Sequence, residues 1–223
     1  MRFFSNKLSC RKSNIHSALL LSCALMVLAD SAHADPIAQN VYIAVDGSDV
    51  ATLTTILTET SGYTTSYTKI EDGTVVFNPA SANSYTGITN INHGTLAVAS
   101  ANSLPNTLVT ISNGSTLQTN AAVTLPNNIY IAGGATTNAQ ASSTFNGVIE
   151  DNGSDLTVRG VGPVYFNADN VLTGTLHVGD GSSTRTLHLI PSSIAGTPML
   201  VKQGTVIYLT GTGTFAPASI NNF

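Results

Sequence analysis

Three carboxylates lie close together in one short turn, and they are the residues of this chain best suited to chemistry. The turn reads Glu150-Asp151-Asn152-Gly153-Ser154-Asp155. Oxygen-rich loops of this kind bind Ca²⁺. A pair of carboxylates such as Asp151 and Asp155 could also serve as the two catalytic groups of a glycoside hydrolase. The spacing matches neither the calcium hand nor the glycine-rich nonapeptide repeat. We therefore expect an acidic surface turn, and the same for Asp46-Gly47-Ser48-Asp49 and Asp180-Gly181.

Two histidines form the second candidate site. His177 and His188 each lie between a leucine and another apolar residue of a strand-like run. A zinc site would need further ligands, and the only cysteines, Cys10 and Cys23, belong to the N-terminal segment that ends at Ala34. We expect both histidines to face solvent.

The sequence lacks the residues that a serine-nucleophile site or a polysaccharide lyase site requires. The chain contains no Gly-x-Ser-x-Gly nucleophile elbow. A polysaccharide lyase needs cations around its acidic substrate. Beyond Ala34 the basic residues are few and scattered, namely Lys69, Arg159, Arg185 and Lys202. We predict no catalytic residue, no metal and no cofactor.

The segment from Met1 to Ala34 has the layout of a signal peptide. The cationic start is formed by Arg2, Lys7, Arg11 and Lys12. The apolar run from Ser17 to Ala29 is shorter than the roughly 20 residues of a membrane span. Ala32-His33-Ala34 supplies the small residues that precede a cleavage site, so we expect cleavage before Asp35. A lipid-modified Cys23 is the alternative, although the apolar run continues past it.

Cleavage changes the character of the chain. It removes both cysteines and leaves four basic against eleven acidic residues, a net charge of −7. A chain without a basic patch is a poor partner for nucleic acid or an anionic membrane surface. We also expect no transmembrane segment between Asp35 and Phe223.

Short runs of alternating apolar and polar residues, rich in Thr and Val, recur along the chain and predict β-strands. Six glycines recur at nearly constant intervals: Gly73, Gly94, Gly114, Gly134, Gly153 and Gly174. A period of about 20 residues is typical of a coil-by-coil repeat, because one rung buries its apolar face only against the next. We predict an all-β fold, a right-handed parallel β-helix with rungs of about that length, short or incomplete.

The alternation also predicts a core and its boundary. Residues 35–68 are expected to cap a β-helical domain over residues 69–223, with near-helical spacing in Asp49 to Glu59. The side chains expected to point inward are Val75, Phe77, Ile91, Leu96, Val98, Leu108, Ile111, Leu117, Ile129, Ile131, Leu156, Val158, Phe166, Leu176, Val178, Leu187, Leu189, Val206 and Tyr208.

One stretch carries a family resemblance. Residues 69 to 96 combine a lysine, a Gly-Thr strand, an Asn-x-Tyr-Thr-Gly turn, a Thr-rich strand and a Gly-Thr-Leu strand. This pattern resembles the autotransporter-associated β-strand repeat of bacterial passenger proteins. The matching positions are Lys69, Gly73, Asn83, Tyr85, Thr86, Gly87, Thr89, Gly94, Thr95 and Leu96.

Two weaker copies follow. Gly162 to Phe166 with Asn170 to Gly174 parallels residues 73 to 87, with Leu172 in place of the tyrosine. Lys202 and Gly204 look like the opening of a third unit. The resemblance implies structural roles for these repeat positions.

The resemblance also implies a function and a place. It indicates a non-enzymatic, exported protein, secreted or on the cell surface, that serves as a scaffold or adhesion surface for glycans or proteins and could associate with another chain through a β-edge. The transmembrane barrel that ends a complete autotransporter is not expected in the short stretch after Gly211, so a periplasmic location stays open. The alternatives are a carbohydrate-active β-helix enzyme, lyase or hydrolase, and a truncated, non-functional autotransporter remnant.

Overall fold

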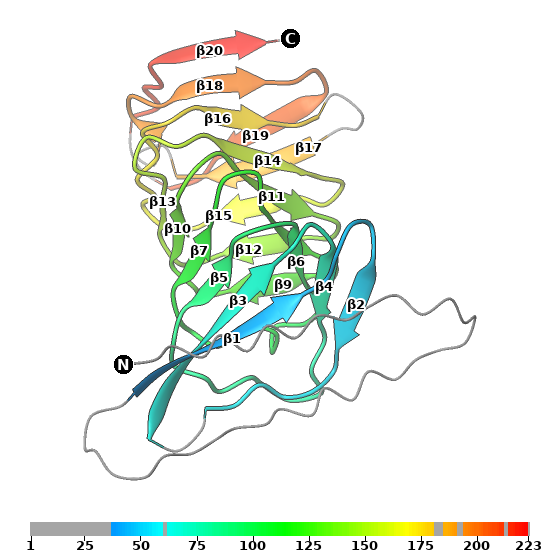
Figure 1. Ribbon diagram of the computed structural model, residues 1–223. Coiled ribbons are helices and arrows are strands. Elements are labelled where there is room, and N and C mark those ends of the chain that lie inside the picture. The colour runs from blue at the N-terminus through cyan, green and yellow to red at the C-terminus, as the bar shows by residue number, and fades with distance from the viewer. Residues whose placement is uncertain (1–36, 60–61, 181–184, 191–193, 212–213, 223) are drawn as a thin grey trace.

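Short parallel strands stack coil upon coil into a β-solenoid of about eight turns, with rungs of about 21 residues. The computed structural model describes residues 37–59, 62–180, 185–190, 194–211 and 214–222. The chain climbs from the blue N-terminal strands to the red strand β20 at the opposite end (Figure 1). The fold predicted from the sequence is confirmed, while the hand of the coil stays a prediction. The leader and its cleavage site lie outside the described residues.

Three sheets, here called sheets A, B and C, form the sides of the coil, and neighbouring strands within each sheet pair in parallel. Sheet A contains, in spatial order, β1 (Ile37–Ala44), β3 (Tyr63–Ile70), β5 (Thr89–Ile91), β7 (Val109–Ile111), β10 (Ile129–Ile131) and β13 (Ile149–Glu150).

Sheet B runs the length of the described solenoid. It contains β2 (Val50–Leu53), β4 (Thr74–Phe77), β6 (Thr95–Val98), β8 (Thr116–Thr119), β11 (Ala135–Ala139), β14 (Leu156–Gly160), β16 (Leu176–Val178), β18 (Pro198–Val201) and β20 (Ser219–Asn222). Sheet C belongs to the later coils and contains β9 (Val123–Leu125), β12 (Ser143–Phe145), β15 (Val164–Phe166), β17 (Arg185–Leu189) and β19 (Thr205–Leu209).

The register places residues one coil apart directly over one another. Thr74, Thr95 and Thr116 are successive partners in sheet B, and Val109 and Ile129 are partners in sheet A. Because side chains alternate between the two faces of a strand, every second position points into the coil. Like residues therefore form columns along the axis, which buries an apolar face that no single rung could bury.

The core is a continuous apolar column. Sixteen of the nineteen side chains predicted to point inward are buried, the exceptions being Leu108, Val206 and Tyr208. Leu108 precedes β7, whose Val109 and Ile111 take the inward positions. In β19 the pairing of Leu187 with Ile207 turns Ile207 toward the core, so Val206 and Tyr208 face outward. A shift of one position moves every side chain of a strand to the other face.

The N-terminal segment is strand rather than helix. The helical spacing of Asp49 to Glu59 was misleading, because Val50–Leu53 forms β2 and pairs with β4. Likewise β1 pairs with β3 along its whole length. The sheets of the first coil thus continue those of the following coils, and the capping role of this segment stays a prediction.

In the part of the chain that the structure describes, no helix combines the length and the apolar character that crossing a bilayer requires.

Candidate functional site

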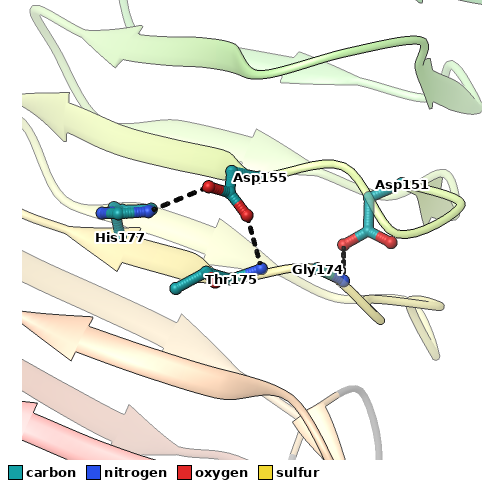
Figure 2. Close-up of polar contacts among 5 residues, drawn as sticks. All are labelled: Asp151, Asp155, Gly174, Thr175 and His177. Carbon is teal, nitrogen blue, oxygen red and sulfur yellow. Dashed lines mark hydrogen bonds and ion pairs between the residues drawn. The ribbon is translucent and has the colours of Figure 1, made fainter.

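The acidic turn does not present its carboxylates to one common space. Asp151 is only 1% exposed. Its carboxylate accepts hydrogen bonds from the backbone N–H of Thr173 at 2.8 and 3.0 Å and of Gly174 at 3.1 Å. It also accepts from the Thr173 hydroxyl at 2.9 Å and from the Gly153 N–H at 3.1 Å. Asp151 therefore ties its own turn to the turn of the next coil (Figure 2).

Asp155 lies on the outside of the same turn. One of its oxygens accepts the Thr175 backbone N–H at 2.9 Å, and the other lies 3.5 Å from Nε2 of His177 (Figure 2). The Thr175 N–H, followed by the imidazole of His177, holds the pKa of the Asp155 carboxyl below its ordinary value. The Asp155 side chain is 54% exposed, so this is a surface contact that joins two coils.

These two environments bear on the proposed hydrolase pair. A glycosidase needs two carboxyl groups that reach one glycosidic bond from opposite sides. Here Asp151 is buried with its oxygens occupied by backbone donors, and Asp155 faces solvent. The arrangement supplies cross-coil hydrogen bonds and leaves one carboxylate and one imidazole at the surface.

The two histidines lie on different sheets and do not converge on a metal. His177 belongs to β16 of sheet B, while His188 belongs to β17 of sheet C. The imidazole of His188 stacks between the rings of Tyr165 and Tyr208, with centroid distances of 4.2 and 4.7 Å. Both histidines are partly exposed, as the sequence predicts. Across the described residues, no three His, Cys, Asp or Glu side chains form a group that could hold a metal ion.

Lys69 is buried, with 2% of its surface exposed. Its ammonium donates to three backbone carbonyls: those of Ile70 at 2.7 Å, Glu71 at 2.6 Å and His93 at 3.2 Å. Burial lowers the pKa of Lys69 to about 8, against the opposing pull of the Asp72 and Glu71 carboxylates. Lys69 thus binds two successive turns together, which is a structural role.

The Asn-x-Tyr-Thr-Gly turn is buried between coils. Asn83 accepts the Leu57 N–H at 2.7 Å and donates to the Ser103 carbonyl at 2.7 Å, so one amide connects three coils. The Tyr85 ring is 1% exposed and packs against Tyr67, and its hydroxyl shares a 2.6 Å hydrogen bond with Thr89. Burial raises the pKa of the Tyr85 hydroxyl.

The remaining residues of the motif support the same turn. Gly87 lies against the backbone of the preceding coil, where an added Cβ would fall 2.3 Å from the Thr65 carbonyl oxygen. Gly94, which has a positive φ of 65°, comes similarly close to the turn of Gly73. Thr86 donates to Glu59 at 2.6 Å, while Thr95 and Leu96 belong to β6, with Leu96 in the core.

The second copy of the motif repeats the turn but not the strand before it. Asn170 and Leu172 are buried like Asn83 and Tyr85, and Gly174 again approaches the backbone of the coil below. However, Val164–Phe166 belongs to sheet C, whereas Thr74–Phe77 belongs to sheet B.

The third unit differs more. Lys202 and Gly204 are exposed and lie between β18 and β19, so Lys202 occupies a different corner of the coil from the buried Lys69.

One further buried amide is not indicated by the sequence pattern. Asn127 is fully buried and donates to the carbonyls of Pro105 at 2.6 Å and Thr107 at 2.8 Å. The Pro-Asn pair signals a turn, but no local feature shows that the amide points inward.

Comparison of the chain with protein-family models, with curated proteins and with solved structures finds no match. The resemblance of residues 69 to 96 to the autotransporter repeat therefore rests on the residues named above and on the solenoid itself.

Proposed function

We propose that this chain is a non-enzymatic, exported solenoid that acts as a passenger-like scaffold or adhesion surface. The observation that carries the proposal is that the distinctive polar side chains of the repeat and of the acidic turn are engaged in joining coils. Lys69, Asn83 and Asp151 all direct their polar atoms to the backbone of neighbouring turns. Residues engaged in this way support a rigid surface rather than a reaction.

The outer face of sheet B supports the same proposal. Threonines stand one per coil in register along it: Thr74, Thr95, Thr136 and Thr157 are partly exposed, while Thr116 in the same row is buried. Beside them the amides of Gln118 and Asn138 are joined by a 2.7 Å hydrogen bond across two coils. A repeated array of hydroxyl and amide groups suits neutral, hydrogen-bonding contacts with glycans or proteins.

The proposal is tested by attachment and by turnover. Beads coated with the purified exported protein should adhere to host or bacterial cells, and fractionation should place the protein beyond the inner membrane. The same preparation should leave pectin, alginate and plant polysaccharides intact. Coated beads that do not adhere to any of these cells would contradict the proposal. Polysaccharide turnover that disappears in Asp155→Asn would replace it with the enzymatic alternative.

A further inference from the structure

The outer face of sheet A carries a hollow of about 400 Å³ that none of the preceding roles uses. This hollow, here called the sheet A hollow, is lined by Leu108, Asn128, Ile129, Tyr130, Val148 and Glu150. Leu108 and Val148 are large apolar residues with 39% and 37% of their surface exposed. Leu108 is also one of the side chains that the sequence predicted to be inside.

The polar groups of the hollow stand in fixed positions. Tyr130 and Glu150 are direct partners in the pairing of β10 with β13, so their backbones lie about 4.8 Å apart. The side-chain oxygen of Asn128 accepts the Val148 N–H at 2.9 Å, which holds this amide between the two apolar residues. Glu150 is exposed, and its carboxylate makes no hydrogen bond or ion pair with any part of the chain that the structure describes.

The charge of Glu150 is also uncompensated by its surroundings. The outward positions in its column of sheet A are occupied by Thr68, Asn90, Thr110, Tyr130 and Val171. None of these side chains carries a positive charge. The whole chain is acidic as well, with a net charge of −4.

These apolar, aromatic and acidic groups together fit a ligand that has an aliphatic stem and a cationic end. Exposed aliphatic side chains pack against a methylene stem, as the stems of Lys and Arg do on apolar surfaces. A tyrosine ring attracts a cation placed within about 6 Å of its centre. A carboxylate next to that ring would then form a charge-assisted hydrogen bond with the same cation.

We propose that the sheet A hollow receives a lysine or arginine side chain of a partner protein. The stem lies against Leu108 and Val148, and the cationic end lies beside Tyr130 and Glu150. The inference deepens the proposed function and rests on it, because it names the chemistry of one contact that an adhesion surface of this chain would make.

The test is an NMR titration of the ¹⁵N-labelled, purified protein with Nα-acetyl-lysine methylamide. Nα-acetyl-norleucine methylamide has a similar stem without the charge and serves as the matched ligand control, and methyl glucoside serves as a neutral sugar probe. Amide signals of Tyr130 and Glu150 should shift when the lysine compound is added. Half-saturation should occur at a ligand concentration at least fivefold lower than for the norleucine compound. The affinity should fall as salt is added, because the contact includes an exposed ion pair.

Variants assign the effect to the hollow. Glu150→Gln keeps the side-chain shape and should weaken lysine binding at least fivefold, and Tyr130→Leu should weaken it while keeping an apolar surface. Asp49→Asn removes an exposed negative charge from another part of the chain and should leave binding unchanged. The melting temperature of each variant shows whether it folds.

Three outcomes overturn the inference: equal binding of the lysine and norleucine compounds, equal loss in Asp49→Asn and Glu150→Gln, or shifts that appear only with methyl glucoside. Adhesion of coated beads is measured separately. Adherent beads with no lysine binding would contradict this inference and leave the proposed function standing. Beads that fail to adhere would contradict the proposed function whatever the titration shows.

Discussion

At the scale of residues, the charged side chains divide into two kinds by their surroundings. Lys69 and Asp151 are buried, and backbone groups of neighbouring turns surround them. Continuing the register of sheet A places both in one inward column, with Ile91, Ile111 and Ile131 between them. A buried charge is tolerable only when its hydrogen bonds are made, and both residues meet that condition. Asp155 and Glu150, by contrast, face solvent.

The first prediction compares the two aspartates of the acidic turn. Asp151→Asn should lower the free energy of unfolding by about 3 kcal/mol, because it places an amide N–H₂ against backbone donors and removes charge-assisted hydrogen bonds. Asp155→Asn is the matched control and should change stability by less than about 1 kcal/mol at neutral pH, because its side-chain contacts are exposed to solvent. Urea unfolding measures both. Equal losses of unfolding free energy in the two variants would show that Asp151 does not stabilise the protein more than Asp155 does.

The second prediction concerns alkali. Because the pKa of folded Lys69 is lowered to about 8 from 10.5, the unfolded chain holds more protons between these two values. Stability should then rise with pH across that window, relative to Lys69→Met, which lacks the titrating group. Urea midpoints of both proteins at pH 7 to 10 give the difference, and parallel curves would contradict the prediction. The raised pKa values of Tyr67 and Tyr85 act in both proteins and cancel.

At the scale of elements, the turn of the repeat matters through close approach rather than through an unusual backbone conformation. Gly87 is not among the glycines that adopt a positive φ. Its N–H donates to the Thr65 carbonyl at 3.0 Å, and its missing Cβ leaves room for the coil below. The constraint is therefore between coils.

The third prediction follows from that contact. Gly87→Ala should destabilise the protein by about 1–3 kcal/mol, the usual cost of overpacking. Gly134→Ala is the control, since the nearest atom to its added Cβ would be the Asn113 Oδ1 at 3.3 Å, and φ there is not positive. Thermal melting of the two variants should differ clearly. A harmless Gly87→Ala would mean that the coils can separate without cost.

The fourth prediction addresses Tyr85. Removing this buried ring in Tyr85→Ala should lower stability by about 3–5 kcal/mol, by analogy with large aromatic-to-alanine changes in cores. Adhesion of coated beads should fall only with the loss of folded protein. An unchanged melting temperature with lost adhesion would identify Tyr85 as a contact residue instead.

At the scale of the whole molecule, stability should vary along the axis. Each coil contacts only the coils next to it, so an inner coil is held on both sides and an end coil on one. β20 illustrates the end state: it pairs only with β18, and all four of its residues are exposed. The stack of Tyr165, His188 and Tyr208 lies near this end, in three successive strands of sheet C.

The fifth prediction is a gradient of amide hydrogen exchange. Protection should be highest in β8 and β11, which have partners on both sides, and lowest in β2 and β20 at the edges of sheet B. Native-state exchange followed by NMR resolves the strands. Uniform protection would indicate that the solenoid opens as one unit.

The sequence by itself determined the repeating features of this protein. Alternating Thr and Val runs, turn residues between them and a regular spacing of glycines predicted parallel coils and most of the core. These features are local or periodic, and the same pattern recurs in the sequence of each rung. A strand pattern that recurs many times is therefore readable even where single runs are short.

Only the tertiary structure decided the phase of individual side chains and the environment of each charge. Leu108 points outward and Asp151 inward because the neighbouring coil sets the register at the ends of short strands. Lys69 and Lys202 both precede a Gly-Thr strand, yet one is buried and the other exposed because they stand at different corners of the coil. Residues a whole coil away along the chain supply these contacts, and a local pattern contains no record of them.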